Sequence, residues 1–166
     1  MKSAKIIVTG VVVFILVVIT VLVMILSYRI DFIRYENDMI KYITPAAADD
    51  AAYAEYNGTK TLLSVNNCEK IRAILTVSER KKLYFKPDIS NCEDVVVLTF
   101  GDELSITVAA DPLEEDLVYV IYEGNKTRYM SIKGYNTMHW LTIAVSVEGY
   151  DGPNYKLHGI EVNNNA

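Results

Sequence analysis

Cysteine and histidine are scarce in this sequence, with only two residues of each type. No C-x-x-C pair occurs, and His139 and His158 lie far along the chain from Cys68, so nothing has the spacing of a zinc site. The motifs G-x-S-x-G, H-E-x-x-H, G-x-x-x-x-G-K-[ST] and G-x-G-x-x-G are also missing. These absences argue against the common hydrolases, nucleotide-binding enzymes and dehydrogenases. We therefore expect a non-catalytic chain without a cofactor.

Charge is absent from the run Ile6 to Tyr28, which contains 23 residues. As a helix rising about 1.5 Å per residue it would span roughly 34 Å, against about 30 Å of bilayer hydrocarbon. A cleaved signal peptide has a shorter apolar core and a small-residue cleavage site; no A-x-A pattern follows this run. The sequence therefore predicts an uncleaved transmembrane anchor at residues 6–28, after a short basic leader at residues 1–5. An apolar span without ionisable residues is not typical of an ion or proton path.

Positive charge is nearly balanced across the anchor, because two lysines precede it and three basic residues follow it by position 41. The positive-inside rule alone gives almost a tie. A short, purely basic leader is typical of a signal anchor, and the domain carries two cysteines and two N-x-[ST] sequons, at Asn57 and Asn125. These features favour a cytoplasmic N-terminus and a C-terminal domain outside.

Residues 29–57 are predicted to form a stalk helix and a linker. The stalk has apolar side chains at helical spacing, namely Phe32, Tyr35, Met39 and Tyr42. A stalk that packs on its own domain is favoured over one that pairs with a partner protein. Pro45 is expected to interrupt the helix. The Ala-rich stretch after it is interpreted as a short helix or flexible connector.

Residues 58–162 are predicted to form an α+β domain, followed by a disordered tail at 163–166. The expected strands have apolar or alternating β-branched residues between turn signals: residues 60–65, 95–100, 104–109, 117–123 and 127–133, with a further candidate at 156–162. Helices are expected at 66–82, capped by Asn66, and at 135–147. The predicted fold is a two-layer domain in which a mostly antiparallel sheet of four to five strands is covered by two helices on one face.

The two cysteines are the first candidate site. Cys68 is predicted at the start of a helix and Cys92 in a loop before the central strands. An extracytoplasmic domain would allow a Cys68–Cys92 disulfide; the alternative is two buried free thiols. A catalytic cysteine is disfavoured, because a reactive thiolate needs a base nearby.

Acidic residues dominate the part after the anchor, where 21 acidic side chains face 14 Lys and Arg and give a net charge of −7. Such a domain is expected to be a poor partner for nucleic acid and a poor peripheral binder of anionic lipid. One loop concentrates carboxylates, namely Asp111, Glu114, Glu115 and Asp116. It lacks the ligand spacing of an EF-hand, so a solvated loop is favoured over a calcium site. No metal site is predicted.

Aromatic and arginine residues on the last two central strands form the second candidate site. Exposed Tyr and Arg are common in protein interfaces, although Tyr is also a good strand residue. The candidate interface residues are Tyr119, Tyr122, Arg128, Tyr129 and Tyr135.

Three functions remain open. The leading expectation is a single-pass membrane protein that presents a small interaction or sensing domain, with another membrane or envelope protein as partner. The second is a pilin-like assembly subunit, since pilins also join an apolar N-terminal helix to an antiparallel sheet. The departure is that Gly10 is followed by VVVFI, without the Glu that the pilin pattern has. The third is an uncharacterised enzyme.

Overall fold

The computed structural model describes residues 2–77, 79–134 and 136–146. The chain divides into two units, Met1–Asp38 and Met39–Ala166. The first unit is a stretch of helix α1 (Lys2–Ala48), and the second holds the end of α1 and the remaining elements. The candidate strand at 156–162 and the predicted tail lie outside the described residues.

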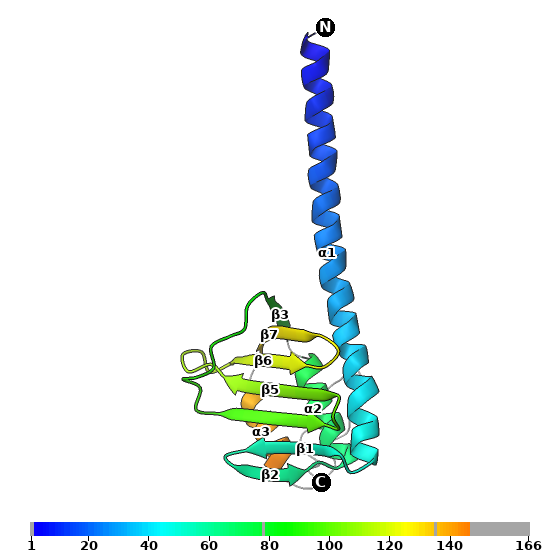
Figure 1. Ribbon diagram of the computed structural model, residues 1–166. Helices are drawn as coiled ribbons and strands as arrows, with labels where there is room; N and C mark the ends of the chain where they lie inside the picture. Colours follow the sequence, from blue (N-terminus) through cyan, green and yellow to red (C-terminus); the bar gives the residue numbers. More distant parts are fainter. Residues whose placement is uncertain (1, 78, 135, 147–166) are drawn as a thin grey trace, which may run out of the picture. The chain divides into compact units, whose positions relative to one another are not determined.

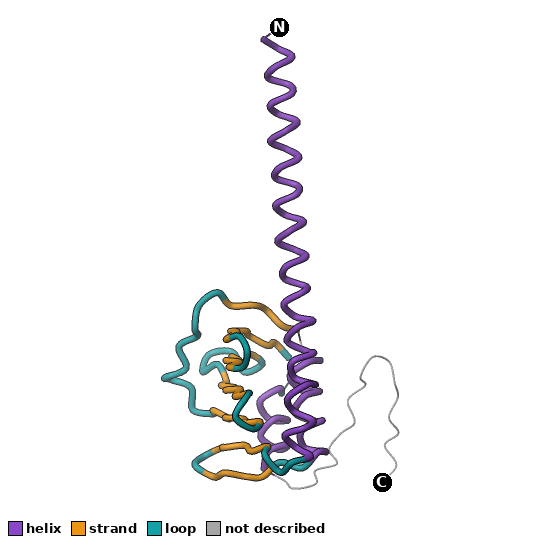
Figure 2. Tube along the Cα trace, turned by 45° about the vertical axis from the view of Figure 1, so that its right-hand side comes forward, coloured by secondary structure: helices purple, strands orange, loops and turns teal. Residues whose placement is uncertain are grey.

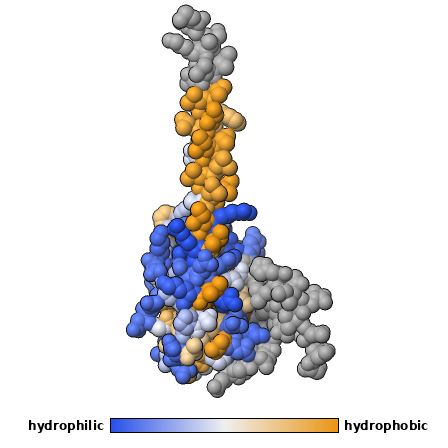
Figure 3. Space-filling model, turned by 90° about the vertical axis from the view of Figure 1, so that its right-hand side faces the viewer, coloured by the Kyte–Doolittle hydropathy of each residue, from blue (hydrophilic) through white to orange (hydrophobic). Residues whose placement is uncertain are grey.

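Helix α1 carries the predicted anchor. From Gly10 to Ala48 it is long and apolar enough to cross a membrane, and no other described helix passes that test. Every described residue from 10 to 30 is exposed, and most of the helix surface seen in Figure 3 above the domain is hydrophobic. The few polar side chains are satisfied within the helix: the hydroxyl of Thr20 donates to the carbonyl of Leu16 at 2.8 Å. This arrangement suits a lipid environment, where no water would pair such groups.

The end of α1 belongs to the folded domain and corrects one prediction. The helix does not stop at Pro45 but continues to Ala48. A proline inside a helix costs about 3 kcal/mol because it removes a hydrogen bond and crowds the preceding turn. Burial of the surrounding side chains offsets this cost, since Ile43, Ala46 and Ala47 are all buried.

The domain is built on a seven-stranded antiparallel sheet with the order β2-β1-β4-β5-β6-β7-β3. Its strands are β1 (Ala52–Tyr56), β2 (Thr59–Leu62), β3 (Glu79–Leu83), β4 (Val95–Phe100), β5 (Leu104–Ala110), β6 (Leu117–Glu123) and β7 (Thr127–Lys133). Helices α2 (Val65–Val77) and α3 (Thr137–Ser146) pack on each other and lie on one side of the sheet (Figures 1 and 2). The α+β class is therefore confirmed, whereas the count of four to five strands is wrong.

Two strands of the sheet are not among the predicted ones: β1, which lies between β2 and β4, and β3, which lies at one edge. The Ala-rich stretch predicted as a connector contains β1, which pairs with both β2 and β4. Its Ala52 and Ala54 are buried, so small residues suit a position on which α3 packs. The domain thus begins before position 58. The second missed strand is β3, which was assigned to the end of the preceding helix and instead pairs with β7. Its basic residues are typical of an edge strand.

Alternation along the strands separates two faces. The face toward the helices, which we call the covered face, holds the core: Val96, Leu98, Ile106, Val108, Val118, Val120, Met130 and Ile132 are all buried. The other face, the open face, is mostly half-exposed. Cross-strand partners share a face, so the register assigns every strand residue to one of the two.

Local capping explains where α2 begins. The N-cap residue is Ser64, two positions before the predicted Asn66. The side-chain oxygen of Ser64 accepts a hydrogen bond from the backbone N–H of Asn67 at 3.2 Å. Asn67 is almost completely buried, and its side-chain amide donates to the carbonyl of Ala144 in α3 at 2.7 Å. This bond joins the two helices. The β1–β2 hairpin turns on Asn57 and Gly58, whose φ angles of 49° and 72° are those of a two-residue turn.

Candidate functional site

The candidate interface residues do not form one surface. Tyr122 is 0% exposed and Arg128 is 8% exposed, and both point to the covered face. The guanidinium carbon of Arg128 lies 5.0 Å from the centre of the Tyr122 ring. A Cβ atom at Gly124 would lie 3.0 Å from the same ring, so any larger residue in the following turn would require the Tyr122 ring to shift by a few tenths of an ångström. The prediction that Tyr122 and Arg128 form an exposed interface is therefore wrong, because both are core residues.

Tyr119 and Tyr129 lie on the open face. Tyr129 is the cross-strand partner of Ile121 on one side and of Leu83 on the other, which makes an apolar row across three strands. Val97 and Thr107 continue this row on β4 and β5. The fifth candidate, Tyr135, lies outside the described residues.

Tyr119 is hydrogen-bonded to the loop that carries Asp111, Glu114, Glu115 and Asp116, which we call the acidic loop. Its hydroxyl donates to the Asp111 carboxylate, which also accepts the backbone N–H groups of Leu113 and Glu114. The hydrogen bond to Asp111, together with burial and nearby negative charge, raises the pKa of Tyr119 to about 12. The same bond and the two backbone bonds hold the pKa of Asp111 below its ordinary value.

The acidic loop directs its carboxylates to different partners. Glu114 forms an ion pair with Lys133 at 3.3 Å, and Asp116 accepts the backbone N–H of Asn136 at 3.4 Å. Within residues 2–77, 79–134 and 136–146, no three Asp, Glu, His or Cys side chains are grouped to hold a metal ion.

The two cysteines are free thiols in the structure. Cys68 lies on α2 and is 1% exposed, and burial raises the pKa of its thiol to about 12. Cys92 lies in the loop between β3 and β4. The pKa of its thiol is raised mainly by burial and, to a smaller extent, by the negative charges of Asp111 and Asp88. Neither thiol is activated as a nucleophile. Their pairing as a disulfide stays a prediction.

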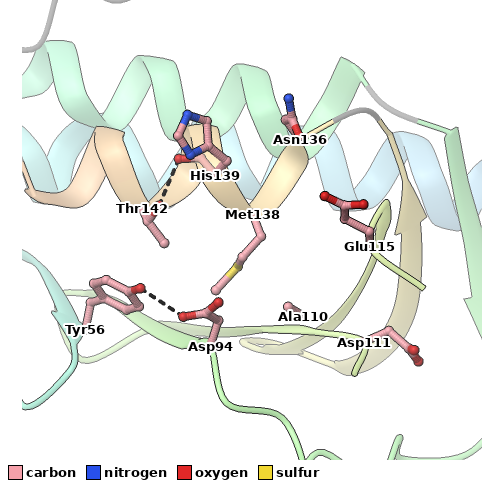
Figure 4. Close-up of a pocket in the computed structure, with 9 residues that line it drawn as sticks. All are labelled: Tyr56, Asp94, Ala110, Asp111, Glu115, Asn136, Met138, His139 and Thr142. Atoms are coloured by element: carbon pink, nitrogen blue, oxygen red, sulfur yellow. Dashed lines mark hydrogen bonds between the residues drawn. The ribbon is translucent and has the colours of Figure 1, made fainter. Parts of the chain in front are cut away.

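A cleft of about 440 Å³ lies between α3 and the ends of neighbouring strands (Figure 4). Its lining comes from β1, β4, β5, the acidic loop and α3: Tyr56, Asp94, Ala110, Asp111, Glu115, Asn136, Met138, His139 and Thr142. The Tyr56 hydroxyl donates to Asp94 at 2.9 Å, and the bond to this carboxylate raises the pKa of Tyr56. Sequence reasoning missed this pair, because 38 positions separate its members.

Several carboxylates make the cleft acidic, and the polar side chains drawn in it do not face one another as a reacting pair. The His139 ring is directed away from Asp94, and the Asp111 carboxylate points out of the cleft (Figure 4). Thr142 donates its hydroxyl to the His139 carbonyl at 2.8 Å instead of facing the imidazole. Among the described residues of the cleft, no nucleophile is therefore aligned with a base. The lining suits a polar or positively charged group.

The most exposed apolar side chains were not predicted. Tyr84 and Phe85 are 82% and 84% exposed at the start of the β3–β4 loop, and Leu113 is 92% exposed in the β5–β6 loop. The signal was present in the sequence as KKLYFK at positions 81–86, where two aromatic residues stand between lysines. The predicted helix 66–82 includes the first two lysines of this stretch, so the strand that presents the aromatic pair is not recognised from the sequence.

No known protein family, no curated protein and no solved structure matches the chain.

Proposed function

We propose that this protein is a single-pass membrane protein that presents a small, non-catalytic interaction domain on the extracytoplasmic side. Its partner is another membrane or envelope protein, which binds the open face of the sheet. The anchor is the apolar part of α1. The orientation rests on the short basic leader and on the two cysteines of the domain.

The observation that carries this proposal is the one-sided covering of the sheet. Helices α2 and α3 cover one face, while no described helix covers the other (Figure 2). The open face nevertheless carries an apolar row, in which the buried Ile121 lies between the half-exposed Tyr129 and Thr107, and the half-exposed Val97 follows Thr107. A solvated sheet face normally bears polar residues. Apolar and aromatic side chains that stay partly exposed at its centre are typical of an interface with a protein.

A photo-crosslinking experiment tests the partner. A photoreactive phenylalanine analogue replaces Tyr129 or Thr107, which both lie on the open face, and a control chain carries it at the exposed Glu69 of α2. Irradiation of native membranes is expected to give the same crosslinked species from positions 129 and 107 but not from position 69. Excess unlabelled full-length chain should compete this species away. No adduct, or identical adducts from all three positions, would contradict the proposal.

A labelling experiment tests the orientation separately. Glu69→Cys in a Cys92→Ser background offers one exposed thiol, since Cys68 is buried. A membrane-impermeant maleimide is expected to label it on intact cells. Labelling only after the cells are broken would place the domain in the cytoplasm and overturn this part of the proposal.

A pilin-like assembly subunit is the second candidate. The observation in its favour is that α1 runs without a break from the apolar segment into the domain. The missing Glu after Gly10 stands against it. Mass spectrometry of the mature chain decides between the two, because a processed pilin would lack the first ten residues.

A further inference from the structure

The segment 81–86, which we call the KKLYFK segment, joins two strongly exposed aromatic residues to basic ones. Tyr84 and Phe85 are more than four-fifths exposed, and Lys81 and Lys86 are exposed on either side of them. A single exposed apolar side chain is common on a protein surface, but here two large aromatic side chains are exposed next to each other. The segment therefore has the composition of a contact surface.

The chemistry of the segment favours a lipid surface over a protein. Lysine is depleted at the centre of protein interfaces. Aromatic residues accompanied by lysine or arginine are instead typical of segments that lie at the boundary between headgroups and acyl chains. There the rings enter the apolar boundary while the ammonium groups stay with anionic phosphates.

The position of the segment within the domain agrees with this partner. Strand β3 pairs with β7 so that Leu83 lies opposite Tyr129, near the β6–β7 turn. From the same turn, Asn125 donates to the hydroxyl of Tyr42 in α1 at 2.6 Å. The later part of α1 leads to β1, because the N–H of Ala51 donates to Ala46 and β1 follows. Tyr84 and Phe85 thus lie on the side by which the chain enters the domain.

The length of the chain before the domain also places a membrane within reach. Only residues 29–38 separate the apolar run from the second unit. Ten residues span at most about 35 Å even when fully extended, which is close to the diameter of a domain of this size. A tether this short keeps the domain at a high effective concentration near the bilayer, so even weak contacts with lipid can hold the segment at the membrane surface.

We propose that Tyr84 and Phe85 insert into the interfacial region of the membrane that holds the anchor, with Lys81 and Lys86 next to anionic phospholipid headgroups. The domain as a whole is acidic, so the contact is local. Charges more than about 8 Å from the headgroups are screened at physiological salt. This contact does not require the open face and is independent of the direction in which the anchor crosses the membrane.

Tryptophan fluorescence in the full-length chain tests the insertion. In a Trp140→Phe background, the single tryptophan is placed by Phe85→Trp or, as a control, by Leu113→Trp. Leu113 is equally exposed but lies in the loop at the opposite ends of the strands. The chain is reconstituted in vesicles of phosphatidylcholine and phosphatidylglycerol that contain lipids with brominated acyl chains. Emission from position 85 is expected to be blue-shifted and several-fold more quenched than emission from position 113.

A second variant tests the role of charge. The double substitution Lys81→Gln and Lys86→Gln should lower the equilibrium constant of the contact roughly 30-fold in anionic vesicles, because it removes two lysines that are each attracted to the anionic surface. In pure phosphatidylcholine the double variant should change nothing. Circular dichroism confirms that each variant is folded.

Three results would contradict the proposal. Equal quenching at positions 85 and 113 would show that the aromatic pair stays in water. If Trp fluorescence at position 85 is unquenched in vesicles, and a photoreactive residue at the same position forms a protein adduct in native membranes, then the segment binds a protein and not lipid. Quenching that is insensitive to both lysines and lipid charge would reject the assignment of anionic lipid.

Discussion

Truncation of two tyrosines on neighbouring strands gives the sharpest test of the sheet register. Tyr122 on β6 and Tyr129 on β7 are of the same residue type and lie on neighbouring strands, but the register places them on opposite faces. Tyr122 is completely buried on the covered face, and Tyr129 is half-exposed on the open face. Substitution of each by alanine therefore removes the same atoms from two different surroundings.

The expected costs differ several-fold. Tyr122→Ala removes a fully buried ring and leaves a cavity, which costs about 3–5 kcal/mol. It also removes the partner that faces the guanidinium of Arg128 at 5.0 Å, a contact of roughly 0.5–2 kcal/mol. Tyr129→Ala removes a ring that is already partly in water, so we expect about 1 kcal/mol. A domain that is stable by about 5–15 kcal/mol would survive the second change easily and the first only in part.

Urea unfolding of the full-length chain in detergent micelles, followed by Trp140 fluorescence, measures both variants. With a slope of about 1–3 kcal/mol per molar urea, the midpoint should fall by roughly 2 M for Tyr122→Ala and by under about 1 M for Tyr129→Ala. Equal shifts, or a larger shift for Tyr129→Ala, would refute the assignment of the faces. Such a result would mean that the strand is shifted by one residue, which exchanges the two sets of side chains.

Three further predictions concern single contacts. Because the pKa of Asp111 is lowered in the folded state, its contribution to stability is present above the unfolded pKa of about 3.9 and is lost as the pH falls through the folded value. Amide NMR of Leu113 and Glu114 should report this titration, and Tyr119→Phe should move it to higher pH; an unchanged midpoint would count against the bond. Under reducing conditions, a thiol reagent should modify Cys92 in the native chain and Cys68 only after unfolding, since Cys68 is 1% exposed; rapid reaction of both would show that α2 is open. Mass spectrometry without reductant tests the predicted disulfide on the same sample. Asn67→Leu leaves the Ala144 carbonyl without its amide donor and should cost about 1–3 kcal/mol in the same urea assay, whereas a neutral effect would mean that the bond does not stabilise the domain.

The central strands could be predicted because their signals are local. The bounds of β4, β6 and β7 agree with the predicted 95–100, 117–123 and 127–133. Each of these strands has an apolar or alternating pattern and ends at a turn. Strands β1 and β3 lack such a pattern. The pairing of β3 with β7 and that of β1 with β4 join residues about 40 or more positions apart, although β1 also forms a local hairpin with β2. An Ala-rich or Lys-rich stretch favours helix by its own propensity, and pairing overrides this.

The candidate sites also divide into features that the local sequence predicts and features that only the folded structure creates. Alternation separates Tyr119 from Tyr122, but it does not tell which of the two faces the helices cover. That choice depends on how α2 and α3 pack, which the Asn67 bond to Ala144 helps to fix. The Tyr56–Asp94 pair in the cleft is likewise created by the fold alone. The exposed pair Tyr84 and Phe85, in contrast, follows directly from the sequence once residues 79–83 are recognised as an edge strand.

The placement of β3 at the end of the sheet has a consequence for the order of folding. This strand is made early in the chain, but its partner β7 follows more than 40 residues later. Contacts of such long separation are entropically costly to close and slow to form. During synthesis residues 79–83 therefore remain without their sheet partner until β7 has been made. A chain cut before residue 127 would lack β7 and leave the edge of β6 open, so the sheet can be completed only after residue 133 has been added.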